Sequence, residues 1–149
     1  MRKIYHKNGF TLLEMMVVLF IIGLLSAITI PGLMRISLQK TTAKAKAELR
    51  VLQVAVESYY LYHNSTYPAG LSELPTAVPT IVKTVVNDPF LSQPGIYGYN
   101  SSSNKKYYVI YSVGPSANGS ASVSDEGVLT ENNGSSCIHV SNIQEDAQP

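Results

Sequence analysis

The longest uncharged stretch of the chain lies near its N-terminus, between Glu14 and Arg35. Nearly all of its twenty residues, 15–34, are apolar or small. As an α-helix they would extend about 30 Å, the thickness of the hydrocarbon core of a bilayer. The preceding flank has three basic residues and no acid: Arg2, Lys3 and Lys7. This pattern predicts a membrane-spanning helix whose N-terminal flank stays on the cytoplasmic side, with the rest of the chain facing outward.

Glu14 stands at the N-terminal edge of the apolar stretch. A carboxylate in hydrocarbon costs on the order of 2 to 3 kcal/mol unless it has a partner, so an acid at this position indicates a function. The alternative is that the side chain reaches the lipid–water interface and has no further role. Position alone leaves both interpretations open.

Beyond the apolar stretch, apolar side chains recur with helical spacing. At intervals of four, three, four and three residues come Ala45, Leu49, Leu52, Val56 and Tyr59. This spacing places them on one face of an amphipathic helix over residues 35–63, and the polar run at 64–68 ends it. The two helical patterns join into one predicted helix from Phe10 to His63, about 80 Å long by its rise per residue.

The second half of the chain predicts a small, loop-rich head. Strand patterns appear at residues 95–100 and 106–113, and the segment Ser-Ser-Ser-Asn at 101–104 between them has turn chemistry. We therefore expect these two strands to pair as an antiparallel hairpin.

Weaker signals surround this hairpin. Residues 71–74 and 80–86 predict short helical or extended pieces, and 127–130 and 136–141 predict two further strands. The last residues, 142–149, are polar and without periodicity, which is typical of a mobile tail. The predicted fold class is α+β, with a long N-terminal α-helix, half membrane-spanning and half amphipathic, packed on a small antiparallel β-sheet head.

Composition limits the classes of function. The chain has 149 residues, of which 45% are hydrophobic and 14% charged, and this length fits one domain. The net charge of +1 does not indicate a nucleic-acid binder. The single cysteine, Cys137, excludes an intrachain disulfide and a four-cysteine zinc site. Common catalytic motifs are absent, and the three histidines, at 6, 63 and 139, show no metal-ligand spacing. His139 alternates with Cys137 on a predicted strand, where partial burial is the ordinary fate. The chain is therefore predicted not to be an enzyme.

The segment Lys-Asn-Gly-Phe-Thr-Leu-Leu-Glu at residues 7–14, followed by the apolar stretch, resembles the class III leader junction of type IV pilins and type II secretion pseudopilins. The resemblance implies that a prepilin peptidase cleaves after Gly9 and methylates the new N-terminus, Phe10. It also places Glu14 and Pro31 where this family has its membrane glutamate and its helix proline.

This processing would leave a charged amine on Phe10 beside hydrocarbon. An amine and a carboxylate attract strongly at low dielectric, and either one alone carries a desolvation cost. We therefore expect Glu14 of one subunit to pair with Phe10 of another and to set the register of a homopolymeric helical filament. Proline removes a helix hydrogen bond and glycine lowers helix propensity, so Gly23 and Pro31 can loosen the backbone. The resemblance implies melting between them on assembly, and a simple kink is equally compatible with the sequence.

The head resembles the major pseudopilins of type II secretion systems in three short segments. These are Asp88-Pro89-Phe90, Gly98-Tyr99 and Tyr111-Ser112-Val113-Gly114. The resemblance implies a pseudopilus subunit stored in the inner membrane as a single-pass protein with its head in the periplasm. It implies as partners the prepilin peptidase, an inner-membrane assembly platform and minor pseudopilins. The alternative is a type IV pilin for adhesion, twitching motility or DNA uptake, the one case with a nucleic-acid partner.

Major pseudopilins hold a calcium ion in the loop after the Tyr-Ser-x-Gly segment. In this chain that loop would be residues 115–126, where Ser124, Asp125 and Glu126 offer oxygen ligands. Calcium usually takes six to eight oxygens and several charges, and acids are scarce before Asp125. A calcium site and a solvated turn both stay open.

These interpretations divide the chain into five parts. They are a cleaved leader at 1–9, a transmembrane and filament-core helix at 10–34, an amphipathic helix at 35–63, a periplasmic head at 64–141 and a mobile tail at 142–149.

Overall fold

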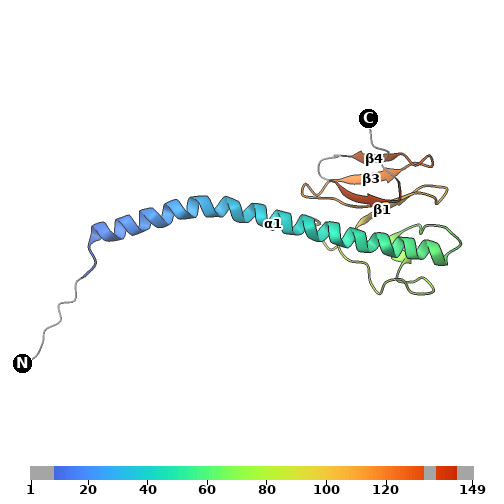
Figure 1. The fold of residues 1–149 in the computed structure, drawn as a ribbon, viewed down its shortest axis with the longest axis horizontal. Helices are drawn as coiled ribbons and strands as arrows, with labels where there is room; N and C mark the ends of the chain where they lie inside the picture. Colours follow the sequence, from blue (N-terminus) through green and yellow to red (C-terminus); the bar gives the residue numbers. More distant parts are fainter. Residues whose placement is uncertain (1–8, 133–136, 144–149) are drawn as a thin grey trace, which may run out of the picture. The chain divides into compact units, whose positions relative to one another are not determined.

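The computed structural model describes residues 9–132 and 137–143, except for the side chains of residues 28–34. Most of the predicted leader, the Pro31 side chain and most of the predicted tail lie outside the described residues. The elements in chain order are α1 (Leu12–Tyr62), a 3₁₀ turn (Leu71–Glu73), β1 (Gly98–Ser101), β2 (Tyr108–Ser112), β3 (Ser120–Val123), β4 (Leu129–Asn132) and β5 (Ile138–Ser141) (Figure 1). Contacts divide the chain into two compact units, Met1–Leu38 and Gln39–Pro149, and each is described by itself.

The N-terminal unit holds the first part of α1. The Thr11 side chain accepts a hydrogen bond from the backbone N–H of Glu14 at 3.2 Å, which satisfies one of the free N–H groups of the first turn. Helix α1 therefore begins two residues after Phe10. In the part of the chain that the structure describes, no helix is long and apolar enough to cross a membrane, so the predicted span is not confirmed here.

The C-terminal unit packs the second part of α1 against a small antiparallel sheet. Of the predicted apolar stripe, Ala45, Leu49, Leu52 and Val56 are buried, and Tyr59 is partly buried. They pack with apolar side chains from the loops and strands, which include Leu71, Leu74, Tyr97, Tyr108 and Ile110. Burying each large apolar side chain contributes about 1.5 to 3 kcal/mol. The predicted α+β fold, a long helix on a small antiparallel sheet, is confirmed.

The sheet that covers α1 has the strand order β1-β2-β5, all antiparallel. The predicted hairpin is its first pair, with Gly98 opposite Tyr111 and Ser101 opposite Tyr108. Gly98 is required here, because a Cβ atom at this position would lie 2.2 Å from the Tyr111 ring.

A second sheet pairs β3 with β4 and lies on the other face of β2. Side chains of β2 alternate between these neighbours. Tyr108 and Ile110 belong to the cluster on α1, whereas Val109 packs with Ala121 and Val123 of β3. The unit thus has three layers: α1, the three-stranded sheet and the two-stranded sheet (Figure 1).

Several local predictions differ from the structure. Strand β1 begins at Gly98, three residues after the predicted start, and helix α1 is shorter at both ends than predicted. Strand β3 lies inside the segment predicted as an open loop, because its residues, Ser-Ala-Ser-Val, have little β propensity and are held by pairing with β4. The described part of the chain between 80 and 86 has no helix or strand. Strand β4 begins at Leu129, two residues after the predicted start.

Candidate functional site

The predicted processing site lies just before α1. Gly9 and Phe10 are outside the helix, and both are exposed, with 69% of Phe10 accessible. An added Cβ atom on Gly9 would meet no atom within 4 Å. A peptide bond outside regular structure and open on all sides is accessible to a peptidase.

Glu14 lies in the first turn of α1 and is exposed. Its backbone N–H is used by the Thr11 cap. Within the described residues its carboxylate has no hydrogen-bond or ion-pair partner, although an acid in the first turn interacts favourably with the helix dipole. The carboxylate is therefore available to a group from another molecule.

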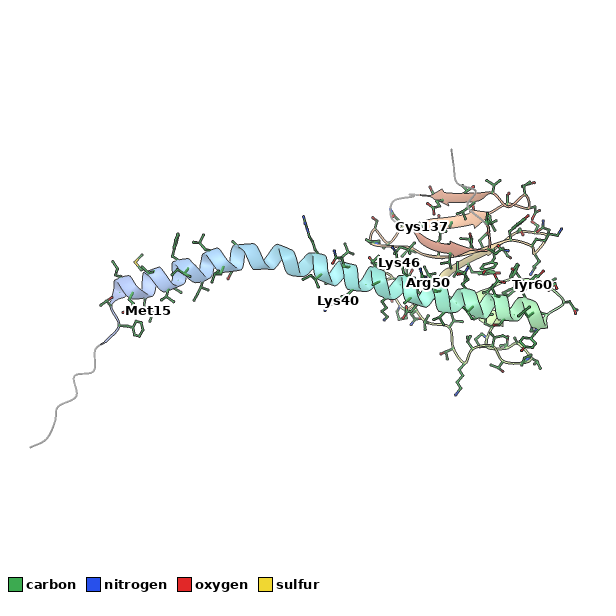
Figure 2. All side chains as sticks on the ribbon, viewed as in Figure 1. Met15, Lys40, Lys46, Arg50, Tyr60 and Cys137 are labelled. Atoms are coloured by element: carbon green, nitrogen blue, oxygen red, sulfur yellow. The ribbon has the colours of Figure 1, made fainter. Side chains whose placement is uncertain are left out.

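The surface of α1 that follows Glu14 is apolar and uncovered. Residues 12–27 are all exposed (Figure 2). The large apolar side chains among them are Leu12, Leu13, Met15, Met16, Val17, Val18, Leu19, Phe20, Ile21, Ile22, Leu24 and Leu25. A contiguous apolar surface of this kind marks a contact with lipid or protein.

Helix α1 continues through both positions predicted to loosen it, Gly23 and Pro31. Gly23 is exposed, and a Cβ atom there would meet nothing within 4 Å. One feature nearby was missed in the sequence: the Ser26 hydroxyl donates a hydrogen bond to the Ile22 carbonyl at 2.8 Å. A serine hydroxyl that bonds the carbonyl four residues earlier often bends a helix. The position of Ser26 between Gly23 and Pro31 is the sequence signal from which this hydrogen bond could have been anticipated.

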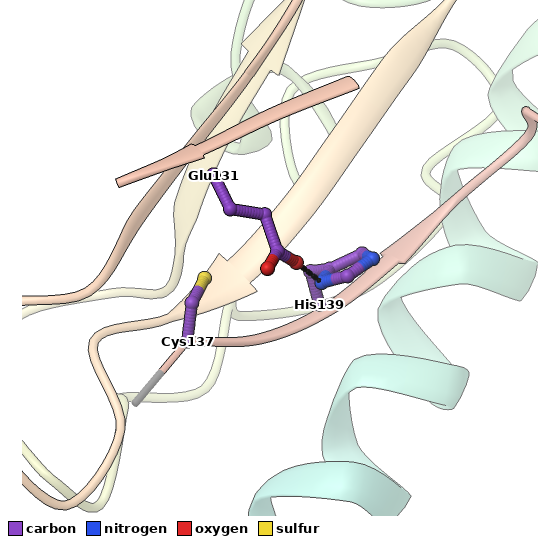
Figure 3. Close-up of side chains that lie close together, drawn as sticks. All are labelled: Glu131, Cys137 and His139. Carbon is purple, nitrogen blue, oxygen red and sulfur yellow. Dashed lines mark ion pairs between the residues drawn. The ribbon is translucent and has the colours of Figure 1, made fainter. Parts of the chain in front are cut away.

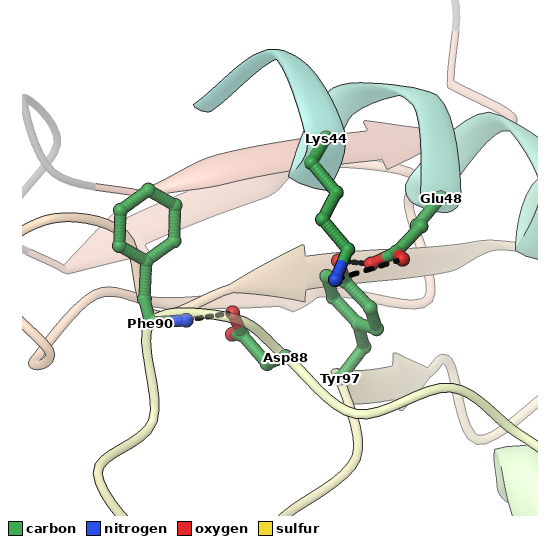
Figure 4. Close-up of polar contacts among 5 residues, drawn as sticks. All are labelled: Lys44, Glu48, Asp88, Phe90 and Tyr97. Atoms are coloured by element: carbon green, nitrogen blue, oxygen red, sulfur yellow. Dashed lines mark hydrogen bonds and ion pairs between the residues drawn. The ribbon is translucent and has the colours of Figure 1, made fainter. Parts of the chain in front are cut away.

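In the head, two of the sequence motifs meet at Asp88, which is only 3% exposed. Its Oδ1 accepts a hydrogen bond from the Ser112 hydroxyl at 2.9 Å. The same atom accepts one from the Phe90 N–H at 3.0 Å (Figure 4). Its Oδ2 accepts one from the Val113 N–H at 2.9 Å. Three donors compensate the cost of burying this carboxylate. Asp88 thereby fixes the end of β2 to the loop that precedes β1.

Tyrosine–glutamate hydrogen bonds fix the head to α1. Tyr97 donates to Glu48 at 2.6 Å, and Lys44 lies 3.8 Å from the same carboxylate (Figure 4). Tyr108 donates to Glu57 at 2.7 Å. Burial, followed by these carboxylates, raises the pKa of both tyrosines, so they stay neutral donors at physiological pH. The sequence suggested packing for the tyrosines but gave no sign of these partners.

The predicted calcium ligands form part of a turn between β3 and β4. The Ser124 hydroxyl oxygen accepts hydrogen bonds from the N–H groups of Glu126 and Val128. Asp125 Oδ1 accepts one from the Asn104 N–H at 3.1 Å. With one acid already engaged, the three residues offer too few side-chain oxygens to hold calcium by themselves. Calcium binding stays a prediction of the resemblance.

Residues 4–30 match the family model of the prokaryotic N-terminal methylation motif. The chain is 33% identical over 112 residues to the type II secretion system core protein G of Aeromonas hydrophila, covering 62% of this chain and 78% of that protein. It is 31% identical over 121 residues to the core protein G of Pseudomonas aeruginosa, covering 73% and 84%.

A shorter match is to the type IV major pilin protein PilA of Myxococcus xanthus, 40% identical over 55 residues, which are 37% of this chain and 25% of that protein. No solved structure matches the chain significantly. The core proteins G are thus matched over most of their length, and the pilin over a quarter. The chain belongs to the family of type II secretion system core protein G, the major pseudopilins.

Proposed function

We propose that this chain is the structural subunit of a helical pseudopilus that serves type II protein secretion. The observation that carries the proposal is the joining of two features in one chain. An N-terminal methylation motif leads into an uncovered apolar helix, and the chain is related to core protein G over most of that protein's length. The work of such a subunit is mechanical, and the chain is not proposed to be an enzyme.

Processing is the first step. A prepilin peptidase cleaves the bond between Gly9 and Phe10 and methylates the amine of Phe10. The position of this bond outside α1, with both residues exposed, supports the proposal. Before processing, residues 10–34 anchor the chain in the inner membrane with the head in the periplasm, and lipid covers the apolar surface.

Assembly is the second step. The amine of Phe10 in one subunit pairs with the Glu14 carboxylate of another, since a misregistered subunit would leave both charges desolvated and alone. Neighbouring copies of α1 then replace lipid on the apolar surface. Gly23 and Pro31 allow the backbone between them to unwind as the helices pack. An inner-membrane assembly platform and minor pseudopilins act with the subunit.

The second candidate is a type IV pilin, favoured by the match to the Myxococcus xanthus pilin. Both functions use the same N-terminal half and differ in the head. The single Cys137 favours secretion, because adhesive type IVa pilins usually close their C-terminal region with a disulfide.

Deletion of the gene in its host tests the proposal. We expect loss of secreted proteins from the medium and their accumulation in the periplasm, while surface pili and twitching motility persist. Complementation with the wild-type gene is the control. Loss of pili and motility with an unchanged set of secreted proteins would instead establish the pilin function.

A further inference from the structure

Three side chains of different chemistry converge in the head, and none of them is among the residues assigned to processing or assembly. The donor atoms of Glu131, Cys137 and His139 all lie within 4.8 Å of one another (Figure 3). Among the described residues this is the one such group of histidine, cysteine and acidic side chains. The side chains of His139 and Glu131 are 22% and 27% exposed, so small ions can reach them.

The fold brings these residues together from two sheets. Glu131 lies on β4 of the two-stranded sheet, and His139 lies on β5 of the three-stranded sheet. Cys137 is two residues before His139 and therefore points to the same side of the strand. Its backbone is tightly packed, since a Cβ atom on Gly119 would lie 3.0 Å from the Cys137 Cα. The convergence thus depends on the packing of the whole head.

We propose that Glu131, Cys137 and His139 bind one zinc ion through a carboxylate oxygen, the thiolate sulfur and the imidazole Nδ1. Zinc takes sulfur, nitrogen and oxygen ligands together, and three protein ligands with one water complete a tetrahedral site. The Glu131 carboxylate already pairs with Nδ1 of His139 (Figure 3). The ion would lie between these two atoms, so the two side chains need little movement, and a proton on Nδ1 would pass to solvent.

Two positive charges of α1 oppose zinc binding. Lys46 and Arg50 line a groove beside His139, and their charges repel a zinc ion. Zinc binds cysteine as the thiolate, so the thiol proton passes to solvent on binding and affinity rises as pH rises.

Bound zinc would add a coordination link between β4 and β5, in addition to the ion pair and to the packing of Leu129 and Cys137 against the same apolar cluster. A ligand that binds only the folded state raises the stability of that state. The site would thus cross-link and stabilise this head, as a disulfide does in chains that have two cysteines.

The experiment uses the full-length chain in detergent micelles, freed of metal and titrated with zinc and with cobalt, whose thiolate complexes absorb in the near ultraviolet. We expect one ion per chain, a cobalt–thiolate band, proton release on zinc binding and a higher melting temperature with zinc. Cys137→Ser should abolish the band, and His139→Gln should weaken zinc binding at least about tenfold.

His63→Gln is the matched control, because His63 lies at the end of α1 and stacks on Tyr59, away from the three ligands. It should bind zinc as the wild type does. Circular dichroism of each variant confirms that it is folded. The proposal is overturned if the folded wild type takes up no stoichiometric zinc, if cobalt gives no thiolate band, or if Cys137→Ser binds zinc unchanged.

Discussion

At the scale of single residues, the Asp88 carboxylate connects two segments of the head that are distant in the sequence. It joins the Asp-Pro-Phe segment to the end of β2 through three hydrogen bonds. Asp88→Asn keeps the shape but turns an amide N–H₂ toward one of the donors. We expect the free energy of unfolding to fall by about 2 to 3 kcal/mol, the range for a hydrogen-bonded charge. Urea unfolding of the full chain in micelles measures this. Asp125→Asn, at an exposed acid, should change it by less, and equal effects would contradict the assigned role.

The tyrosines that face α1 give a second prediction, in alkaline solution. Burial, and then Glu57, raises the pKa of Tyr67 from 10.0 to about 12. The folded state therefore keeps a proton that the unfolded state has lost. The resulting stabilisation is complete below pH 10 and is lost as the pH rises toward 12. We expect the free energy of unfolding to decrease between these values, and Tyr67→Phe to make the decrease shallower. An unchanged slope in the variant, followed by circular dichroism, would refute this origin.

At the scale of elements, the turn after β1 and the turn before β4 are clamped to each other. The Asn104 backbone N–H donates to Asp125 Oδ1, and its side-chain amide donates to the Asp125 carbonyl at 3.0 Å. Asn104→Ala should lower the free energy of unfolding by about 1 to 2 kcal/mol.

Because the clamp already engages Asp125, we expect excess calcium to leave the melting temperature of the metal-free chain unchanged. A clear rise with calcium, absent in Asp125→Asn, would instead support the calcium site.

The elements that the sequence predicts well are those whose pattern is local. The stripe from Ala45 to Val56 and the hairpin of β1 and β2 depend on spacing and turn chemistry within a few residues, and both are found. Strand β3 was missed because its four residues are small and polar, and its partner β4 supplies the reason for its extended backbone. A non-local pairing of this kind leaves little local signal.

The same distinction applies to the sites. The processing motif at Gly9, Phe10 and Glu14 can be recognised because its residues are neighbours. The bond between Ser112 and Asp88 joins positions 24 residues apart. Likewise, the spacing of Glu131, Cys137 and His139 in the sequence matches no metal motif. Glu131 and His139 belong to strands of different sheets, and only the folded head shows that they lie close together.

At the scale of the whole molecule, the chain combines an uncovered apolar helix with a head that satisfies its own polar groups. Among the described residues no buried side-chain nitrogen or oxygen lacks a hydrogen-bond partner. The longest run of exposed large apolar side chains is in the N-terminal unit, from Leu12 to Leu25, and in the proposed filament this run supplies the main apolar contact.

A substitution of Glu14 tests the proposed assembly without changing the apolar surface or the head. Glu14→Ala removes the charge that is proposed to pair with the methylated amine, while the apolar surface proposed to hold the chain in lipid stays intact. We expect the variant to be cleaved and methylated, which intact mass shows, and to remain in the membrane fraction. Filaments counted by electron microscopy should decrease at least about tenfold, because each misregistered subunit leaves two charges unpaired. Glu126→Ala, at an exposed acid of the head, should assemble normally. Abundant filaments from Glu14→Ala would show that the apolar surface alone sets the register.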